Sequence, residues 1–407
     1  MRPIYLFDDG RALLTPLTDL RPMFDVRTGA LTLIGRLAAA GELQVIGVFV
    51  PDTLAALTRE RHTVSVNPVL DRRQGFIAVN ARCPMVRAAD IERLGQPGSA
   101  LVHGSSGEII AAHLTPDLLP AVLAGDTAPF RLEKSREDPL LDPFTRPWHI
   151  RARRDALIRL DLAFLFTAMA QADTHAAGSS THVAATAKVH SGVVFDTDGG
   201  PVYLADHAVV RPGAVLCGPC YIGPHSTVMD RAVIRGSTSI GPHCKVAGEI
   251  SGTIFQSFSN KAHDGFLGDS WIGEWVNLGA GTTNSNLLNT YAEVIARVTP
   301  DATNEYTGQQ FLGATIGDHV KTAICTRIMT GCIIHTGSMI ATTAAATGCI
   351  PPFAWCTDDG VRQFRLAKFL DVVRAMMARR TLTPTAAYLQ RISELHAALT
   401  PPAEPAT

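Results

Sequence analysis

Aliphatic residues recur at every sixth position over a long stretch in the second half of the chain. Eight of them form an unbroken series: Leu204, Val210, Leu216, Ile222, Val228, Ile234, Ile240 and Val246. The spacing resumes at Ile272 and Leu278 and again from Ile316 to Ile340, with Thr322 in the one vacant position. Six is neither the period of an α-helix nor the alternation of a strand. The pattern predicts coils of three short strands that stack in parallel, with about eighteen residues per coil.

The first 150 residues have a different pattern, in which short apolar runs alternate with helical segments. The runs Pro3–Phe7, Val45–Val50 and Gly75–Val79 indicate buried strands. The segments Leu31–Ala40 and Asp52–Glu60 between them indicate helices. Strands that alternate with helices favour a layered α/β domain.

These patterns divide the chain into three parts. We assign residues 1–175 to the α/β domain, 176–350 to a β-helix and 351–407 to a short helical tail. A helix over Asp155–Ala170 is expected to lead into the β-helix. The tail contains apolar residues at intervals of three and four, which is typical of an amphipathic helix. Its cations are Arg362, Arg365, Lys368, Arg379 and Arg380. We interpret these cations as a solvated face, and phosphate binding by some of them is the alternative.

Composition narrows the class of protein. The 407 residues include 36 Lys and Arg against 37 Asp and Glu, so the net charge is −1. This balance argues against nucleic-acid binding through a basic surface. No apolar run approaches the ~20 residues of a membrane span, and the N-terminus carries acids where a signal peptide would be apolar. With eight cysteines, an ordinary number, we expect a cytoplasmic protein without membrane contact.

Two patterns of cysteine and histidine are interpreted as structural. Cys217 and Cys220 flank a Gly-Pro pair, as in redox motifs. The motif lies between two positions of the hexad repeat, Leu216 and Ile222, and so belongs to the predicted β-helix. A redox thiol needs a helix N-terminus to lower its pKa, so we expect no redox role. His207, His225 and His243 are one coil apart and should stack at one corner at roughly 5 Å. A solvent-facing ladder is favoured over a metal site.

The stretch from Lys261 to Asn286 interrupts the hexad spacing between Val246 and Ile272, so it is expected to contain a loop excursion. Polar residues collect in it: Lys261, His263, Asp264, Asp269, Asn277, Asn284 and Asn286. His263 is a candidate general base, because histidine titrates near neutral pH. The alternatives are a structural histidine and, for the asparagines, hydrogen bonding between stacked coils.

The hexad array resembles the left-handed β-helix of hexapeptide acyltransferases. Within it, His263, the segment Phe266–Asp269, the segment Asn277–Thr282 and Asn286 are similar to the acetyltransferase domain of the bifunctional N-acetylglucosamine-1-phosphate uridyltransferase/glucosamine-1-phosphate acetyltransferases. That family has tyrosine where this chain has Phe266. The resemblance implies acetyl transfer from acetyl-CoA to an amino-sugar phosphate, with glucosamine 1-phosphate as the expected acceptor.

The same resemblance assigns roles in the site. His263 and Asn286 would be catalytic, Ala280, Gly281 and Asn286 would bind acetyl-CoA, and Lys261 and Asn277 would contact the acceptor. It also implies a homotrimer with sites shared between subunits. A different amino sugar as acceptor and a non-catalytic trimeric scaffold with a sugar-nucleotide-sensing N-terminal domain are the alternatives.

The N-terminal stretch YLFDDGRALLTPLTDLRPMFDVRTGALTL resembles divergent bacterial GlmU-type sugar nucleotidyltransferases. The resemblance implies uridylyl transfer from UTP with Mg²⁺. Orthodox members have a Gly-rich loop that binds phosphates, whereas this chain has Phe7–Arg11, and Asn80 stands in place of a metal-binding Asp. Arg11, Arg21 and Arg27 are candidates for phosphate binding. The alternative is that these arginines form ion pairs with neighbouring acids, and whether this domain is catalytic stays open.

Overall fold

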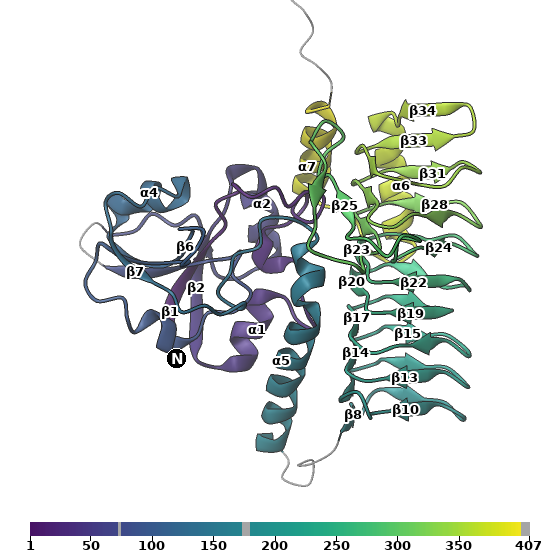
Figure 1. Ribbon diagram of the computed structural model, residues 1–407, viewed down its shortest axis with the longest axis horizontal. Helices are drawn as coiled ribbons and strands as arrows, with labels where there is room; N and C mark the ends of the chain where they lie inside the picture. The colour runs from purple at the N-terminus through teal and green to yellow at the C-terminus, as the bar shows by residue number, and fades with distance from the viewer. Residues whose placement is uncertain (72–74, 173–179, 400–407) are drawn as a thin grey trace, which may run out of the picture.

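The computed structural model describes residues 1–71, 75–172 and 180–399 of the chain. A layered α/β domain packs against a long stack of short strands, and two C-terminal helices lie beside the upper coils of the stack (Figure 1). The β-helix and the layered α/β domain expected from the sequence are both confirmed. Among the described residues, no helix combines the length and apolarity needed to cross a bilayer.

The α/β domain is built on one seven-stranded sheet in the order β3-β2-β1-β4-β6-β5-β7. Its strands are β1 (Arg2–Phe7), β2 (Leu43–Phe49), β3 (Ser65–Val66), β4 (Phe76–Asn80), β5 (Ser99–Val102), β6 (Ile109–Leu114) and β7 (Arg131–Lys134). The central strands β2, β1 and β4 are parallel, and β6 runs antiparallel to β4. The helices are α1 (Leu33–Ala40), α2 (Asp52–Arg61), α3 (Ala88–Ile91) and α4 (Leu119–Ala124), with short 3₁₀ turns at Met23–Asp25 and Pro116–Leu118. The helices expected at 31–40 and 52–60 correspond to α1 and α2.

The β-helix has three faces. The first face holds β8 (Thr181–Val183), β11 (Val202–Leu204), β14 (Cys220–Ile222), β17 (Thr238–Ile240), β20 (Ile254–Ser257), β23 (Trp271–Glu274), β27 (Thr315–Ile316), β30 (Ile333–Ile334) and β32 (Cys349–Ile350). The second face holds β9 (Lys188–Val189), β12 (Val209–Val210), β15 (Thr227–Val228), β18 (Lys245–Val246), β21 (Asn260–Lys261), β28 (Lys321–Thr322), β31 (Met339–Ala341), β33 (Ala354–Thr357) and β34 (Gly360–Gln363). The third face holds β10 (Val194–Asp196), β13 (Val215–Cys217), β16 (Val233–Ile234), β19 (Glu249–Ser251), β22 (Phe266–Gly268), β24 (Thr283–Asn284) and β29 (Arg327–Ile328).

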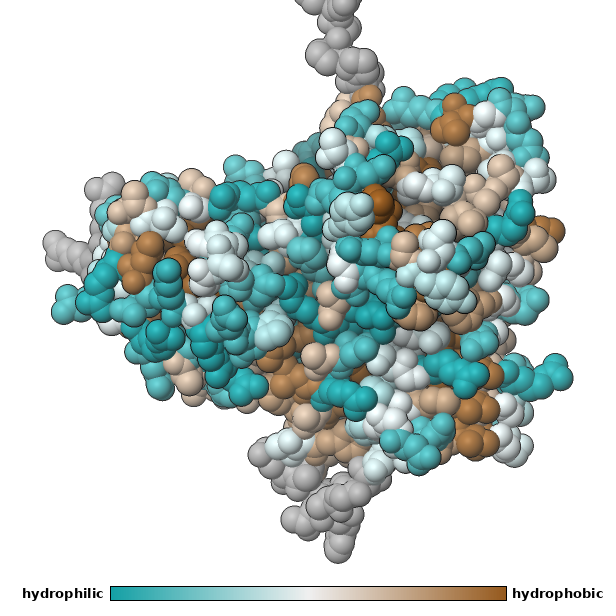
Figure 2. All heavy atoms as spheres, in the orientation of Figure 1, coloured by the Kyte–Doolittle hydropathy of each residue, from teal (hydrophilic) through white to brown (hydrophobic). Residues whose placement is uncertain are grey.

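The hexad residues fill the interior of this stack. Val210 lies opposite Val228, and Val228 lies opposite Val246, as expected for residues one coil apart. The eight residues of the unbroken series are fully buried and belong to one apolar cluster. At the open end of the stack, the first coil leaves Val183, Val189 and Val194 exposed, and hydrophobic residues show on the surface of these lower coils (Figure 2).

The expectation of a loop excursion within Lys261–Asn286 is wrong for residues 261–284, which the strands β21 (Asn260–Lys261) to β24 (Thr283–Asn284) follow. The coils run through this region in register but are shorter: Val233 pairs with Glu249, and Ser239 pairs with Ile254. Residues are lost from the corners, which shifts the phase of the repeat without breaking the stack. The excursion lies later, between β24 and β27, and carries the hairpin of β25 (Ile295–Ala296) and β26 (Glu305–Tyr306).

Two helical elements hold the domains together. The helix α5 (His149–Ala172) runs beside the first face of the β-helix (Figure 1), where its Ile158 and Leu162 share a buried cluster with Tyr221. The helices α6 (Leu366–Ala378) and α7 (Ala386–Ala397) form the tail, and Tyr388 and Ile392 of α7 pack with residues of α2. The coils extend beyond residue 350, the boundary assigned from the sequence, because β33 pairs in parallel with β31.

Candidate functional site

His263 lies on an exposed turn at the corner between the second and third faces. The turn connects β21 to β22, and the side chain of His263 faces solvent. Lys261, the last residue of β21, lies two positions before His263. Its side chain points into the core, opposite Val246 on the neighbouring coil. A histidine presented on a fixed backbone is suited to proton transfer.

Lys261 holds this turn from inside the β-helix. Its ammonium donates to the carbonyl oxygens of His263 (2.8 Å), Asp264 (2.7 Å) and Ala247 (3.4 Å). Only 1% of the residue is exposed, and burial lowers the pKa of Lys261 to about 8, against the opposing attraction of Asp264. The prediction that Lys261 contacts the acceptor is therefore wrong. The shortened coil moves it into a core position, which the sequence spacing did not reveal.

The turn that contains Ala280 and Gly281 lies against the His263 turn, one coil further on. The carbonyl oxygen of Thr282 approaches Gly265 so closely that the chain has no room for a Cβ there. Gly281 has a φ of +72°, a backbone conformation that favours glycine. The structure thus places the turn of His263 beside two of the three residues expected to contact acetyl-CoA, Ala280 and Gly281.

Asn286 belongs to a polar network on the third face. Its Nδ2 donates to Asp269 Oδ2 at 2.7 Å. Asp269 also forms ion pairs with Arg151 (3.1 Å) and Arg154 (2.8 Å), which both come from α5, and it accepts a hydrogen bond from Arg154. One amide donor of Asn286 is thus used within the chain, and the expected contact with acetyl-CoA is left to its remaining atoms.

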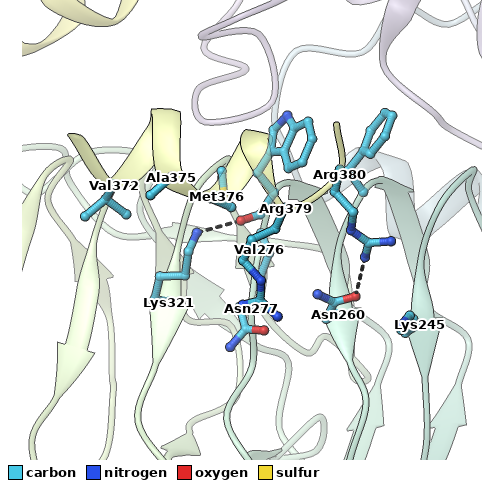
Figure 3. Close-up of a pocket in the computed structure, with 12 residues that line it drawn as sticks. Lys245, Asn260, Val276, Asn277, Lys321, Val372, Ala375, Met376, Arg379 and Arg380 are labelled. Carbon is cyan, nitrogen blue, oxygen red and sulfur yellow. Dashed lines mark hydrogen bonds between the residues drawn. The ribbon is translucent and has the colours of Figure 1, made fainter. Parts of the chain in front are cut away.

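Asn277 is exposed on the second face, where backbone bridges place it between Asn260 and Lys321. These residues border a pocket of about 490 Å³ between the second face and α6 (Figure 3). The pocket is lined by Lys245, Phe258, Asn260, Trp275, Val276, Asn277, Lys321, Val372, Ala375, Met376, Arg379 and Arg380. Sequence reasoning proposed Asn277 but missed the pocket, because the approach of α6 to this face is a tertiary contact.

Two polar contacts shape the pocket. The Lys321 ammonium donates to the carbonyl oxygens of Trp275 (2.7 Å) and His319 (3.0 Å), and burial lowers the pKa of Lys321 to about 7. Arg380 donates to Asn260 Oδ1 at 3.0 Å and so ties the end of α6 to the β-helix. Figure 3 draws the hydrogen bond from Lys321 to the Trp275 carbonyl and the one from Arg380 to Asn260.

The arginines proposed to bind phosphate in the α/β domain have different roles. Arg21 is fully buried and forms ion pairs with Asp318 (2.9 Å) and Glu274 (3.0 Å) of the β-helix. Arg27 is 8% exposed, and its backbone N–H donates to Gln256 Oε1 at 2.8 Å. The prediction is wrong for these two, because their charges are enclosed at the interface between the domains. Arg11 is exposed and remains a candidate.

A metal site was expected at the ends of β1 and β4. The guanidinium of Arg82 lies there instead, paired with carboxylates of the same domain. Arg82 donates to both carboxylate oxygens of Asp9 (3.1 and 2.8 Å) and also pairs with Glu108. Both ends of the Asn80 amide are hydrogen-bonded within the chain, since it donates to the Ile109 carbonyl and accepts from the backbone of Arg82.

The carboxylate of the neighbouring Asp8 is also hydrogen-bonded within the chain. Its two oxygens accept backbone N–H groups of Gly10 (3.1 Å) and Met23 (2.6 Å), and burial raises the pKa of Asp8. Mg²⁺ prefers free carboxylates and water. Nowhere in the described part of the chain do three His, Cys, Asp or Glu side chains form a group that suits a metal ion. The residues present do not fit the Mg²⁺ that the resemblance implied.

The three histidines form the stacked ladder expected from their spacing, and the two cysteines lie on strands of the β-helix. His207, His225 and His243 stack at centroid distances of 4.7 and 4.8 Å. The ladder continues through Phe258 and Trp275, at 4.6 and 4.5 Å, which the sequence reasoning missed because the shortened coils break the eighteen-residue spacing. Cys217 and Cys220 are unpaired and lie on β13 and β14, and burial raises the pKa of both thiols.

Comparison with known proteins finds a family model that matches the α/β domain. Residues 4–168 match the family model described as sugar nucleotidyl transferase. A bifunctional sugar-1-phosphate nucleotidylyltransferase/acetyltransferase of Sulfurisphaera tokodaii is 37% identical over 83 residues. That alignment covers 20% of this chain and 20% of the relative, so the chain spans a fifth of the length of the curated protein it matches.

Solved structures resemble the β-helix. The polySia-specific acetyltransferase NeuO is 14% identical with a TM-score of 0.27, over 54% of this chain and 99% of that one. The Arabidopsis UDP-N-acetylglucosamine acyltransferase is 10% identical with a TM-score of 0.23, over 53% of this chain and 90% of that one. These likenesses concern the fold, and scores this low carry no argument about activity.

Proposed function

We propose that the β-helix transfers an acetyl group from acetyl-CoA to the amine of an amino-sugar phosphate, with glucosamine 1-phosphate as the first acceptor to test. The observation that carries the proposal is the exposed His263 on a turn fixed from inside by Lys261 and packed against the Ala280–Gly281 turn. A general base and a row of backbone amides on adjacent coils are the groups that acyl transfer requires.

In the proposed reaction, the amine nitrogen attacks the thioester carbonyl, and His263 accepts the proton that the amine loses. The oxygen of the tetrahedral intermediate gains negative charge, which backbone N–H groups near Gly279–Gly281 would stabilise. The carbon–sulfur bond then breaks, and the protonated His263 returns the proton to the leaving thiolate. Asn277 would orient the acceptor. A homotrimer, in which a neighbouring subunit closes the exposed site, accords with the exposure of His263.

Release of the CoA thiol in the presence of glucosamine 1-phosphate tests this proposal. We expect His263→Ala to lower kcat by about 10²–10⁴-fold, the range of general-base catalysis, with the trimer and the acetyl-CoA affinity retained. A panel of other amino-sugar phosphates tests the acceptor. Absence of thiol release with every acceptor would favour the non-catalytic scaffold.

For the α/β domain, we propose binding of a sugar nucleotide without uridylyl transfer. The observation that favours this alternative is the pairing of Arg82 with Asp9 and Glu108 where a metal was expected. We expect no pyrophosphate release from UTP and N-acetylglucosamine 1-phosphate with Mg²⁺. Metal-dependent release that Arg11→Ala abolishes would contradict the proposal.

A further inference from the structure

The pocket beneath α6 combines an extended polar floor with an apolar roof. Lys245, Asn260, Asn277 and Lys321 lie on successive coils of the second face, so their backbones are spaced at roughly 4.8 Å. The roof is the side of α6 that carries Val372, Ala375 and Met376 (Figure 3). The volume of about 490 Å³ lies within the range of sites for small molecules.

The ionisable residues that line this pocket are all basic. Among the described residues that line it, four are basic, Lys245, Lys321, Arg379 and Arg380, and none is acidic. Cations collected without a carboxylate repel one another, and an anion between them relieves that repulsion. Lys321 has three ammonium donors, and its two carbonyl partners occupy two of them. One donor remains for a ligand.

We propose that this pocket binds the phosphate of a ligand in the acyl transfer. The cations of the second face and of α6 would hold the phosphate from two sides, and Asn260 and Asn277 would bond to neighbouring hydroxyl or carbonyl groups. The role in acyl transfer rests on the proposed function, whereas phosphate binding itself does not.

The distance to His263 is compatible with one ligand that reaches both places. His263 follows Asn260 by three residues, and three residues of extended chain span at most about 10 Å. A sugar phosphate or the pantetheine arm of CoA can bridge such a distance. Phosphate groups occur both in CoA and in the expected acceptor, so the experiment has one arm for each.

Isothermal titration of the full-length protein with CoA and, separately, with glucosamine 1-phosphate tests the proposal. The variant Lys245→Gln/Arg379→Gln removes one charge from each side of the pocket, and both side chains are exposed, so the fold should survive. The single variant Arg379→Gln guards against loss of the fold in the double variant. Arg374→Gln is the matched control, because Arg374 is also on α6, is exposed and is absent from the lining.

We expect at least one probe to bind wild type, and the double variant to weaken that binding by at least about tenfold, because each removed contact is charge-assisted. Arg374→Gln should change the affinity less than about twofold, and added salt should weaken wild-type binding. Loss of CoA binding would assign the pocket to the acyl donor, and loss of glucosamine 1-phosphate binding to the acceptor.

Three results would overturn the proposal: neither probe binds wild type, the double variant binds as wild type does, or the control weakens binding equally. These results are separate from a failure of the proposed function. If thiol release depends on His263 but the double variant binds as wild type does, the phosphate-binding proposal is wrong and the proposed function stands. If the double variant abolishes binding but the protein transfers acetyl to no acceptor, the proposed reaction is wrong and the phosphate-binding proposal stands.

Discussion

Lys261 shows how one residue can support a site without touching the ligand. Its side chain fills a position that valine or isoleucine occupies in other coils, and its ammonium is enclosed by three carbonyl oxygens. Burial of an ammonium costs free energy that hydrogen bonds to carbonyl oxygens only partly offset. If His263 is the general base that we propose, Lys261 acts as a positioning residue for its turn.

We expect Lys261→Met to lower kcat for acetyl transfer by at least about tenfold with little change in the KM for acetyl-CoA, because the turn at His263 loses its internal donors. Steady-state kinetics of the full-length protein measure both constants. Lys188→Met, an exposed change on the same face, is the control and should leave both unchanged. A KM that rises while kcat stays constant would instead assign Lys261 to ligand binding.

Lys261 also affects stability as a function of pH. A lysine whose folded pKa is lowered, here to about 8, contributes stability that is present above the unfolded value and is lost as the pH falls through the folded value. We therefore expect the unfolding free energy of wild type, relative to Lys261→Met, to decrease between pH 10 and pH 7. Denaturant titrations at these two pH values measure the difference, and a relative increase would contradict the burial of the ammonium.

At the scale of elements, the hexad spacing was sufficient to predict the β-helix. It failed where coils lose residues at corners, because backbone pairing between neighbouring coils tolerates a shortened corner that a fixed period does not describe. Val233 pairs with Glu249 across such a coil. The motif residues His263, Ala280 and Gly281 lie on adjacent turns that the stack aligns.

Gly265 sits where two of these turns meet, and we expect Gly265→Ala to displace the turn of His263. Its φ is +107°, and the neighbouring Thr282 carbonyl leaves no space for a methyl group. Acetyl transfer should fall by at least about tenfold, since a displacement of about 1 Å can cost 10²-fold in rate. Thiol-release assays and thermal unfolding check both effects.

Gly308→Ala separates crowding from backbone strain. Gly308 also has a positive φ, +71°, but open space surrounds its Cα. Alanine there should lower the stability by about 1 kcal/mol, the usual cost of a non-glycine residue in this region, and leave acetyl transfer intact. Equal losses of activity in the two variants would mean that the His263 turn is not sensitive to its neighbour.

At the scale of the whole molecule, the domains share buried polar contacts that a division into separate units does not anticipate. Trp271 Nε1 donates to the Arg27 carbonyl at 3.0 Å, and Gln256 Nε2 donates to the Asp25 carbonyl at 2.7 Å. Arg21 reaches across to Asp318 and Glu274. The polar character of these residues can be read from the sequence. Their contact partners cannot, because the partners lie more than two hundred residues away along the chain. Arginines suggested for phosphate binding therefore proved to be interface residues.

Arg21→Met tests whether this interface is essential to the folded molecule. The change leaves Asp318 and Glu274 buried without their shared cation, and breaking a buried ion pair in this way typically costs about 3–5 kcal/mol. Arg11→Met, an exposed change in the same domain, should stay within about 0.5 kcal/mol of wild type. Unfolding free energies from denaturant titrations of the full-length protein measure both.

The loss should depend on pH in a defined direction. Burial raises the pKa of Asp318 to about 6 even though Arg21 opposes this effect, so removal of Arg21 should raise it further. An acid whose folded pKa exceeds its unfolded value loses stability as the pH rises through the folded value. We therefore expect Arg21→Met to be less destabilising at pH 5, where Asp318 can be neutral, than at pH 8. A loss of equal size at both values would show that the charge of Asp318 does not decide how the two domains hold together.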